Sequence, residues 1–189
     1  MIGRLRFLLG VALLTLSGCA SSGGQLSGDS IARFGPPGPA PDGEGEVYVA
    51  RTFIQADYDA VWDHLTKAEL YEGWWTCPAI TFGTTKNAKL LWGTPDCPVY
   101  EGKLARLEKG EGLAFSLRFV GFDFDEPATP IAIYARDRGS AVLVEVFHDA
   151  RRAPQSSSII GRVGWPKLLA RLKTLLETGQ EMEWPDTES

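Results

Sequence analysis

The residues from Gly161 to Gly179 constrain the fold more than any other part of the chain. Their apolar side chains recur at the spacing that places them on one face of a helix: Trp165, Leu168, Leu169, Leu172, Leu175 and Leu176. Pro166 suits the first turn of this helix and Gly179 suits its end. The opposite face, which carries Arg171 and Lys173, is expected to lie in solvent. A helix with so wide an apolar stripe must pack on a large partner.

The segments before this helix supply a partner in the form of a sheet. Two short helices are predicted at residues 57–65 and 67–72, the first with Asp57 as its N-cap. Strands are predicted where β-branched and apolar residues alternate with polar ones, at 46–54, 88–92, 99–107, 113–120, 131–136 and 141–148. This order predicts an α+β domain, in which the long C-terminal helix packs across one face of an antiparallel sheet that could be curved.

The N-terminus has the features of a bacterial lipoprotein signal. Arg4 and Arg6 precede a short apolar run that ends in Leu16-Ser-Gly-Cys19, which looks like a lipobox. The run is too short to cross the hydrocarbon core as a helix, which needs about 20 residues. We therefore predict a signal peptide at 1–18 and acyl chains such as palmitate on Cys19. Ala20 resembles the residue found in lipoproteins sorted to the outer membrane.

The rest of the chain divides into a linker, one domain and a tail. Residues 19–45 are rich in Gly, Pro and Ser and cannot bury enough apolar surface to fold, so they predict a disordered tether to the membrane. Residues 46–180 are long enough for one well-filled core. Residues 181–189 are expected to form a flexible tail. The predicted location is the periplasm-facing side of the cell envelope, at the outer membrane more than the inner.

Composition excludes several classes of function. The formal net charge of the chain is -5 and its basic residues do not cluster, which disfavours nucleic-acid binding. Two His and three Cys without CxxC or HxxxH spacing give no basis for a metal site. Nucleophile-elbow, dinucleotide-binding and P-loop motifs are absent, so no cofactor is expected.

The order of motifs in the domain resembles the START-like (SRPBCC) superfamily. The relevant segments are Val61-Trp-Asp-His-Leu-Thr66, Trp74-Trp75, Tyr100-Glu-Gly-Lys-Leu104 and Leu113-Ala-Phe-Ser-Leu117. The closing segment from Gly164 to Gly179 is most similar to the AHSA-type branch, which is named after an activator of a heat-shock chaperone ATPase. The resemblance implies a helix-grip fold with a cavity between the sheet and the last helix.

We expect this cavity to bind a small hydrophobic or amphipathic ligand. Trp side chains supply apolar area together with an N–H donor, and strand alternation selects the inward-facing positions. The residues predicted to line it are Trp74, Trp75, Trp92, Phe115, Leu117, Phe119, Val144, Val146, His148, Trp165, Leu169 and Leu172. The alternative is that many of these side chains simply fill the core.

His148 is the candidate for chemistry in the cavity. Strand alternation places it on the same face as Val144 and Val146, where it could act as an acid or base. Some relatives are cyclases or dehydratases, so a cavity enzyme with His148 as proton-transfer group is one alternative to a binding protein. A hydrogen-bonded His at the cavity rim is the simpler interpretation, and binding is favoured over catalysis.

Two further features complete the predictions. Cys77 and Cys97 form an even pair once Cys19 carries lipid, and they predict a disulfide in an oxidising compartment. The acidic loop from Phe122 to Glu126 lacks the pattern of a calcium loop and predicts a solvated lid with its Phe side chains turned inward.

Besides a ligand-binding protein and a cavity enzyme, a third possible function is an envelope interaction module that binds no ligand. We expect the protein to be a monomer.

Overall fold

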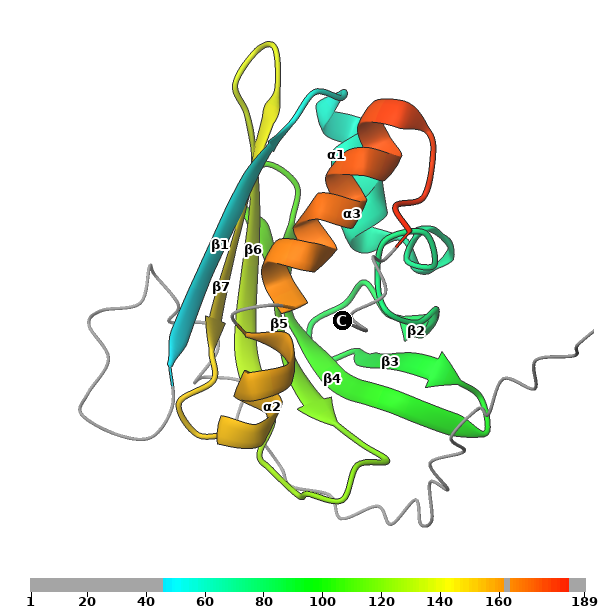
Figure 1. The fold of residues 1–189 in the computed structure, drawn as a ribbon, viewed down its shortest axis with the longest axis vertical. Coiled ribbons are helices and arrows are strands. Elements are labelled where there is room, and N and C mark those ends of the chain that lie inside the picture. Colours follow the sequence, from blue (N-terminus) through cyan, green and yellow to red (C-terminus); the bar gives the residue numbers. More distant parts are fainter. Residues whose placement is uncertain (1–45, 162–163, 184–189) are drawn as a thin grey trace, which may run out of the picture.

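A seven-stranded antiparallel sheet forms the centre of the domain (Figure 1). The computed structural model describes residues 46–161 and 164–183. The predicted signal peptide at 1–18, the lipidated Cys19, the linker at 19–45 and the last six residues of the tail lie outside the described residues. The strands are β1 (Val47–Ile54), β2 (Ala79–Phe82), β3 (Lys89–Thr94), β4 (Cys97–Glu108), β5 (Gly112–Phe119), β6 (Thr129–Asp137) and β7 (Val142–Asp149).

The strand order across the sheet is β1-β7-β6-β5-β4-β3-β2. Every strand from β2 to β7 therefore pairs with its neighbour in sequence, and β1 closes the order by pairing with β7. The sheet curves so that its concave face holds the core, as the helix-grip fold requires (Figure 1). The predicted fold class is confirmed.

Helices cover the concave face of this sheet. They are α1 (Tyr58–Thr66), the 3-10 helix η2 (Ala68–Leu70), α2 (Pro154–Ile160) and α3 (Gly164–Thr178). The two predicted short helices after β1 are thus present as α1 and η2. Asp57 occupies the N-cap position of α1, although its side chain makes no capping hydrogen bond. Figure 1 shows α3 lying across the sheet, with α1 at one end and α2 at the other.

The long helix packs as its apolar stripe predicts. Trp165, Leu168, Leu169 and Leu172 are buried against the sheet. Gly179 adopts a φ of 71° and its N–H donates to the carbonyl of Leu175 at 2.8 Å, which ends the helix in the expected left-handed conformation.

Arg171 departs from the solvent-facing position predicted for it. Its guanidinium donates to the carbonyl of Trp75 at 3.1 Å and to the carbonyl of Gly73 at 3.4 Å. These bonds join α3 to the segment that carries the Trp pair. The reason is that Arg combines a long apolar stem with a charged fork, so it can reach back over a buried neighbour from the edge of the stripe.

Two elements were not predicted. The short edge strand β2 pairs with β3 through Ala79, Thr81 and Phe82, and it carries too few residues to show an alternation in the sequence. The polar Gln155-Ser-Ser-Ser segment forms α2, which begins at Pro154. Pro at the first helical turn favours this start, because its missing N–H would have no partner there.

Candidate functional site

The residues predicted to line a cavity all lie in the interior. All twelve are buried: Trp74, Trp75, Trp92, Phe115, Leu117, Phe119, Val144, Val146, His148, Trp165, Leu169 and Leu172. Apart from His148, they belong to one continuous hydrophobic cluster. Their position on the inner face agrees with strand alternation and the helix stripe. Whether they contact a ligand stays a prediction.

Trp75 stands at the centre of an aromatic cluster. Its ring centroid lies 5.2 Å from that of Trp74, 5.6 Å from that of Trp165 and 5.9 Å from that of Trp92. The Trp75 and Trp92 rings are stacked, with an interplanar angle of 26°. The three partners come from the same loop, from α3 and from β3. Much of the predicted cavity lining is therefore aromatic packing between helix and sheet.

The indole N–H groups of this cluster fall into two kinds. Trp74 donates to the carbonyl of His64 at 3.0 Å, and Trp165 donates to the Nδ1 atom of His148 at 3.1 Å. The Nε1 atoms of Trp75 and Trp92 are buried and have no hydrogen-bond partner in the described part of the chain. A buried donor without a partner costs about 1–3 kcal/mol, and such groups often mark functional sites.

His148 lies at 0% exposure beneath α3, not at a rim. An indole N–H can only donate, so the bond from Trp165 makes Nδ1 the acceptor and leaves the proton on Nε2. Nε2 then donates to Thr129 Oγ1 at 2.8 Å, and the Thr129 hydroxyl donates to the carbonyl of Leu117 at 3.1 Å. Each side-chain polar group in this series of hydrogen bonds, from Trp165 through His148 to Thr129, has a partner.

The environment of His148 keeps its ring neutral. Desolvation by burial lowers the pKa of His148 to about 4, although the nearby charge of Asp149 acts in the opposite direction. Among the described residues, no carboxylate forms a hydrogen bond with the His148 ring. Asp149 is paired with Arg151, whose hydrogen bonds hold the pKa of Asp149 below its ordinary value although burial raises it. Glu145 pairs with Arg136 on the outer face of the sheet. This geometry offers neither an open ring nitrogen nor an orienting carboxylate for proton transfer.

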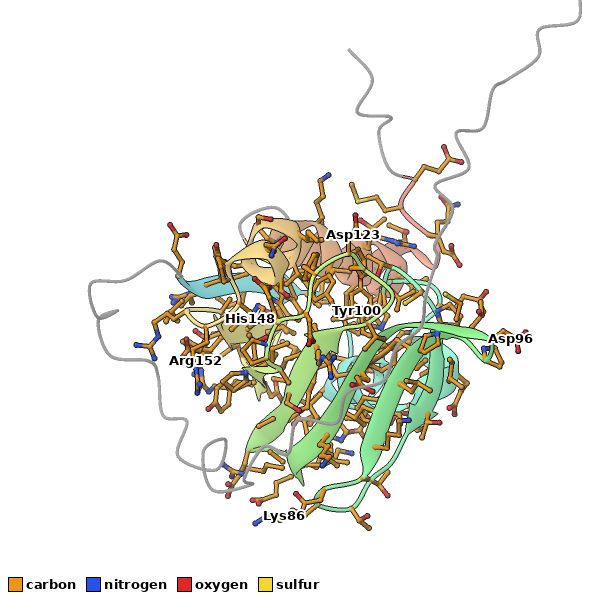
Figure 2. The ribbon with its side chains drawn as sticks, turned by 90° about the horizontal axis from the view of Figure 1, so that it is seen from below. Lys86, Asp96, Tyr100, Asp123, His148 and Arg152 are labelled. Carbon is orange, nitrogen blue, oxygen red and sulfur yellow. The ribbon has the colours of Figure 1, made fainter. Side chains whose placement is uncertain are left out.

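A pocket of about 190 Å³ opens beside the aromatic cluster. It is lined by residues from four places in the fold: Thr76 after the Trp pair, Tyr100 of β4, Ile159 and Ile160 of α2, and Gly164, Lys167 and Leu168 of α3. Tyr100 lies beneath the helices, as His148 does, whereas Lys86 and Asp96 mark turns at the outside of the sheet (Figure 2). The pocket thus sits between sheet and helices.

Three of the described residues that line the pocket have polar side chains, and they are Thr76, Tyr100 and Lys167. Thr76 Oγ1 and Tyr100 Oη share a hydrogen bond of 3.2 Å. Burial raises the pKa of Tyr100, so its phenol stays protonated near neutral pH. The Tyr100 ring also packs edge-on against Phe119, at 4.9 Å between centroids, and the Trp75 ring lies 6.3 Å away. Tyr100 therefore links the pocket wall to the predicted lining residues Trp75 and Phe119.

The helix α2 that walls the pocket is held by a few side-chain contacts. The Glu126 carboxylate accepts hydrogen bonds from the Gln155 N–H at 2.8 Å, and from the Ser156 N–H and Ser156 hydroxyl at 2.7 Å each. These bonds leave the pKa of Glu126 lowered, although desolvation pushes it upward. A further bond of 2.7 Å joins the Tyr48 and Ser157 hydroxyls. The acidic loop therefore anchors α2 through its last carboxylate.

The Phe side chains of the acidic loop turn inward only in part. Phe122 and Phe124 pack on Phe119, with centroid separations of 5.2 Å and 6.0 Å, yet Phe122 remains 39% exposed. Asp125 pairs with Arg118 of β5 at 2.8 Å. The loop is thus fixed by specific contacts at its apolar and its acidic positions.

The predicted disulfide is wrong for this structure, because Cys77 and Cys97 are both free thiols. The two residues flank β3 on opposite sides. The carbonyl of Pro78 accepts from the Gly93 N–H, while Cys97 pairs with Thr94 on the β4 side. Strands are spaced about 4.8 Å apart, so two intervals exceed the Cα separation that a disulfide tolerates. The sequence predicted both the loop length and the strand at 88–92, but it did not show that this strand separates the two thiols in the sheet.

Two kinds of feature are absent from the part of the chain that the structure describes. Within 46–161 and 164–183, no group of three or more His, Cys, Asp or Glu side chains is placed to hold a metal ion. In the same ranges, no helix has the length and apolar character needed to span a bilayer.

Most of the pocket lining was missed by the sequence analysis. Leu168 was in the apolar stripe, but Lys167 next to it carried no special signal. Tyr100 could have been selected by extending strand alternation through β4, because it faces inward with Leu104. Ile159 and Ile160 required the recognition of α2, and Thr76 required the tertiary fold.

Comparison with solved structures identifies the fold. DynU16, from the dynemicin biosynthetic locus, matches with a TM-score of 0.61 and 19% identity over 74% of this chain, which spans only 51% of DynU16. CalU16 from Micromonospora echinospora has a TM-score of 0.57 and 20% identity, covering 76% of this chain and 81% of CalU16. The Aha1 dimer from Colwellia psychrerythraea has a TM-score of 0.58 and 16% identity, covering 71% and 98%.

These identities support a shared fold alone, and no curated protein sequence matches the chain significantly. The family assignment comes from a sequence model. The model described as "Activator of Hsp90 ATPase homolog 1-like protein" matches residues 55–177, from the end of β1 to the end of α3. That range contains the aromatic cluster, His148 and the whole lining of the pocket. The chain therefore belongs to the AHSA1 family, with the helix-grip fold of the START-like superfamily.

Proposed function

We propose that this protein binds a small hydrophobic or amphipathic molecule non-covalently, between the sheet and the helices α2 and α3. The observation that carries this proposal is the pocket of about 190 Å³ walled by Tyr100, Ile160 and Leu168. Its volume is below the roughly 300–1,000 Å³ of most drug-sized sites. The ligand is therefore small, or only part of it enters.

The unpartnered indoles support the same function. Trp75 and Trp92 bury two N–H donors that the described residues leave unsatisfied, and the Trp75 ring is next to Tyr100 of the pocket wall. A ligand with an acceptor atom, admitted by a shift of the aromatic rings, would satisfy one of these donors. Such a shift would enlarge the pocket into the region predicted from the sequence, including Phe115 and Trp92.

The cavity-enzyme alternative receives no such support. Both nitrogens of His148 are engaged, and the ring is held between Trp165 and Thr129. Proton transfer to a substrate would first have to break one of these bonds. Binding without chemistry is therefore the function that this geometry favours.

We also propose a lipid anchor at Cys19 that holds the domain at the membrane, on the periplasm-facing side of the envelope. The support is the lipobox and the Gly, Pro and Ser composition of residues 19–45. Labelling with an alkyne analogue of palmitate tests it, with Cys19→Ser as the matched variant. Label on the wild type but not on the variant is the expected result, and an unlabelled wild type in the membrane fraction would refute the anchor.

Native mass spectrometry of the full chain, before and after organic extraction, tests the binding function. We expect an additional mass that disappears on extraction and returns when the extract is added back. A bare mass, together with no binding of an environment-sensitive apolar dye, would contradict the proposal and favour an interaction module without ligand.

A further inference from the structure

Two of the exposed apolar side chains gather at one end of the domain. In the described part of the chain, the large apolar side chains that remain exposed are Val49, Phe53, Phe122 and Ile159. Phe122 belongs to the acidic loop and Ile159 to α2, and these two segments are joined by the three hydrogen bonds that Glu126 accepts. Phe122 and Ile159 therefore lie at the same end, whereas Val49 and Phe53 lie along β1.

The pocket opens at this end. Ile159 lines the pocket and is 43% exposed, so the opening lies beside it. On the side of the acidic loop, the Phe122 ring packs on Phe119 at 5.2 Å between centroids. Phe119 in turn packs on Tyr100 of the pocket wall at 4.9 Å. Exposed apolar surface is thus present next to the pocket on both α2 and the acidic loop.

The chain enters the domain at the same end. The carbonyl of Glu46 accepts a hydrogen bond at 3.0 Å from the N–H of Ala150, shortly before α2. The Tyr48 hydroxyl forms a bond of 2.7 Å with Ser157 of α2. Figure 1 shows the start of β1, the helix α2 and the loop after β5 together at one end, with α1 at the other.

This placement matters because residues 19–45 separate β1 from the proposed anchor at Cys19. A flexible chain of that length spans about 30 Å on average, so the anchor holds the domain close to the lipid surface. Such a tether does not fix which side of the domain faces the membrane. Exposed apolar side chains favour the end that carries them, because they can enter the headgroup region of a bilayer.

Side chains of both charge signs surround the two apolar residues. Asp123 is exposed next to Phe122, and Arg152 is exposed shortly before α2. Both are labelled in Figure 2, which views the domain from this end. Asp125 pairs with Arg118. A zwitterionic headgroup also carries both signs, whereas an anionic surface would bring like charge close to Asp123.

We propose that this end of the domain docks on a zwitterionic lipid surface through Phe122 and Ile159. The pocket then opens toward the bilayer, and an apolar ligand passes between membrane and pocket without crossing bulk water. This inference rests on the proposed anchor and binding function, and it adds the surface on which the domain acts.

The experiment tethers the full chain to phosphatidylcholine vesicles whether or not cells acylate it. Cys77→Ser and Cys97→Ser leave Cys19 as the single thiol, which is coupled to a maleimide lipid. Hydrogen exchange of the tethered protein is compared with that of the same protein free in solution. We expect slower exchange at the amides of residues 121–126 and 155–160. The hairpin between β6 and β7, which lies at the α1 end, should not change.

Phe122→Gln and Phe53→Gln form a matched pair. Phe53 is 56% exposed against 39% for Phe122, but it lies near the α1 end of β1. Phe122→Gln should reduce the protection about fivefold, because a partly exposed Phe contributes part of its full transfer free energy. Ile159→Gln should act in the same direction, and Phe53→Gln should have no effect. Exchange of each variant without vesicles gives the baseline, so that a loosened loop is not mistaken for a lost contact.

The outcomes separate docking from the proposals on which it rests. Equal effects of Phe53→Gln and Phe122→Gln, or no protection at residues 121–126 and 155–160, would overturn the docking surface. Protection on anionic phosphatidylglycerol vesicles alone would overturn the choice of a zwitterionic surface. Neither result bears on the binding function, which native mass spectrometry tests without vesicles. A bare native mass with intact protection would refute ligand passage and leave the docking surface standing.

Discussion

His148 and Tyr100 lie under the same helices but in opposite chemical situations (Figure 2). Around His148, a continuous chain of hydrogen bonds runs from Trp165 to Thr129 and on to the carbonyl of Leu117. Around Tyr100, a hydroxyl pair borders a pocket, and the adjacent Trp75 indole N–H has no hydrogen-bond partner among residues 46–161 and 164–183. Buried polar groups stabilise the fold where each one is paired, and we propose that the donors left over beside Tyr100 serve a ligand.

The largest expected effect comes from His148→Ala. The change removes the acceptor for the Trp165 N–H and the donor to Thr129, and it leaves a cavity. We expect a loss of about 3–5 kcal/mol of unfolding free energy, measured by urea denaturation.

His148→Gln is the comparison variant, because its amide can replace one of the two hydrogen bonds, and it should lose less stability. An alanine variant with wild-type stability would show that the hydrogen bonds of His148 do not stabilise the fold. The proposed difference between the His148 region and the Tyr100 region would then be refuted.

The second prediction concerns the pH dependence of stability. His148 has a pKa of about 4 in the folded protein and about 6.5 when unfolded, so the unfolded state binds a proton first as the pH falls. Stability should therefore decline between about pH 6.5 and pH 4, by up to about 3 kcal/mol, and recover as the pH rises again.

Urea midpoints measured across this range give the slope. His148→Gln should flatten it, because Gln does not titrate. A wild-type slope of zero across the window would mean that the buried ring accepts a proton as easily as an exposed one.

The third prediction tests whether the pocket wall is less firmly held than the His148 region. Glu126→Gln replaces the charged acceptor at the start of α2 and should cost about 1–2 kcal/mol. Hydrogen exchange should quicken at the amides of α2 and stay unchanged in β7. Asp123→Asn is the matched control in the same loop, since Asp123 is exposed. Equal acceleration in both regions would argue against a separately held wall.

The smallest effect on stability is expected for Tyr100→Phe. The ring stays and one hydrogen bond to Thr76 is lost, which costs about 1 kcal/mol. The affinity for an environment-sensitive apolar dye should change little, because the ring of Tyr100, which lines the pocket, stays in place. A loss of dye affinity of about tenfold or more would show that the hydroxyl takes part in binding.

Regular patterns carried most of the fold prediction. The stripe of α3, its end at Gly179 and the inward face of β7 follow from side-chain periodicity, which the local backbone fixes. The same reasoning missed β2 and α2, since four and seven residues are too few for a period to show. The same reasoning wrongly predicted a disulfide between Cys77 and Cys97, because the number of residues between them does not show that β3 separates them in the sheet.

The contacts of the candidate site could not be predicted from local sequence patterns, because they join residues that are far apart in the chain. Alternation placed His148 on the inner face, and only the packing of β6 and α3 around it decided that both ring nitrogens are occupied. Likewise, the sequence predicted Trp75 as an inward aromatic residue, but the inward position of Tyr100 and the pocket beside it became apparent only in the tertiary structure. Periodicity determines the face on which a side chain lies. The partner it meets there is set by contacts between residues far apart in the chain, and these exist only after folding.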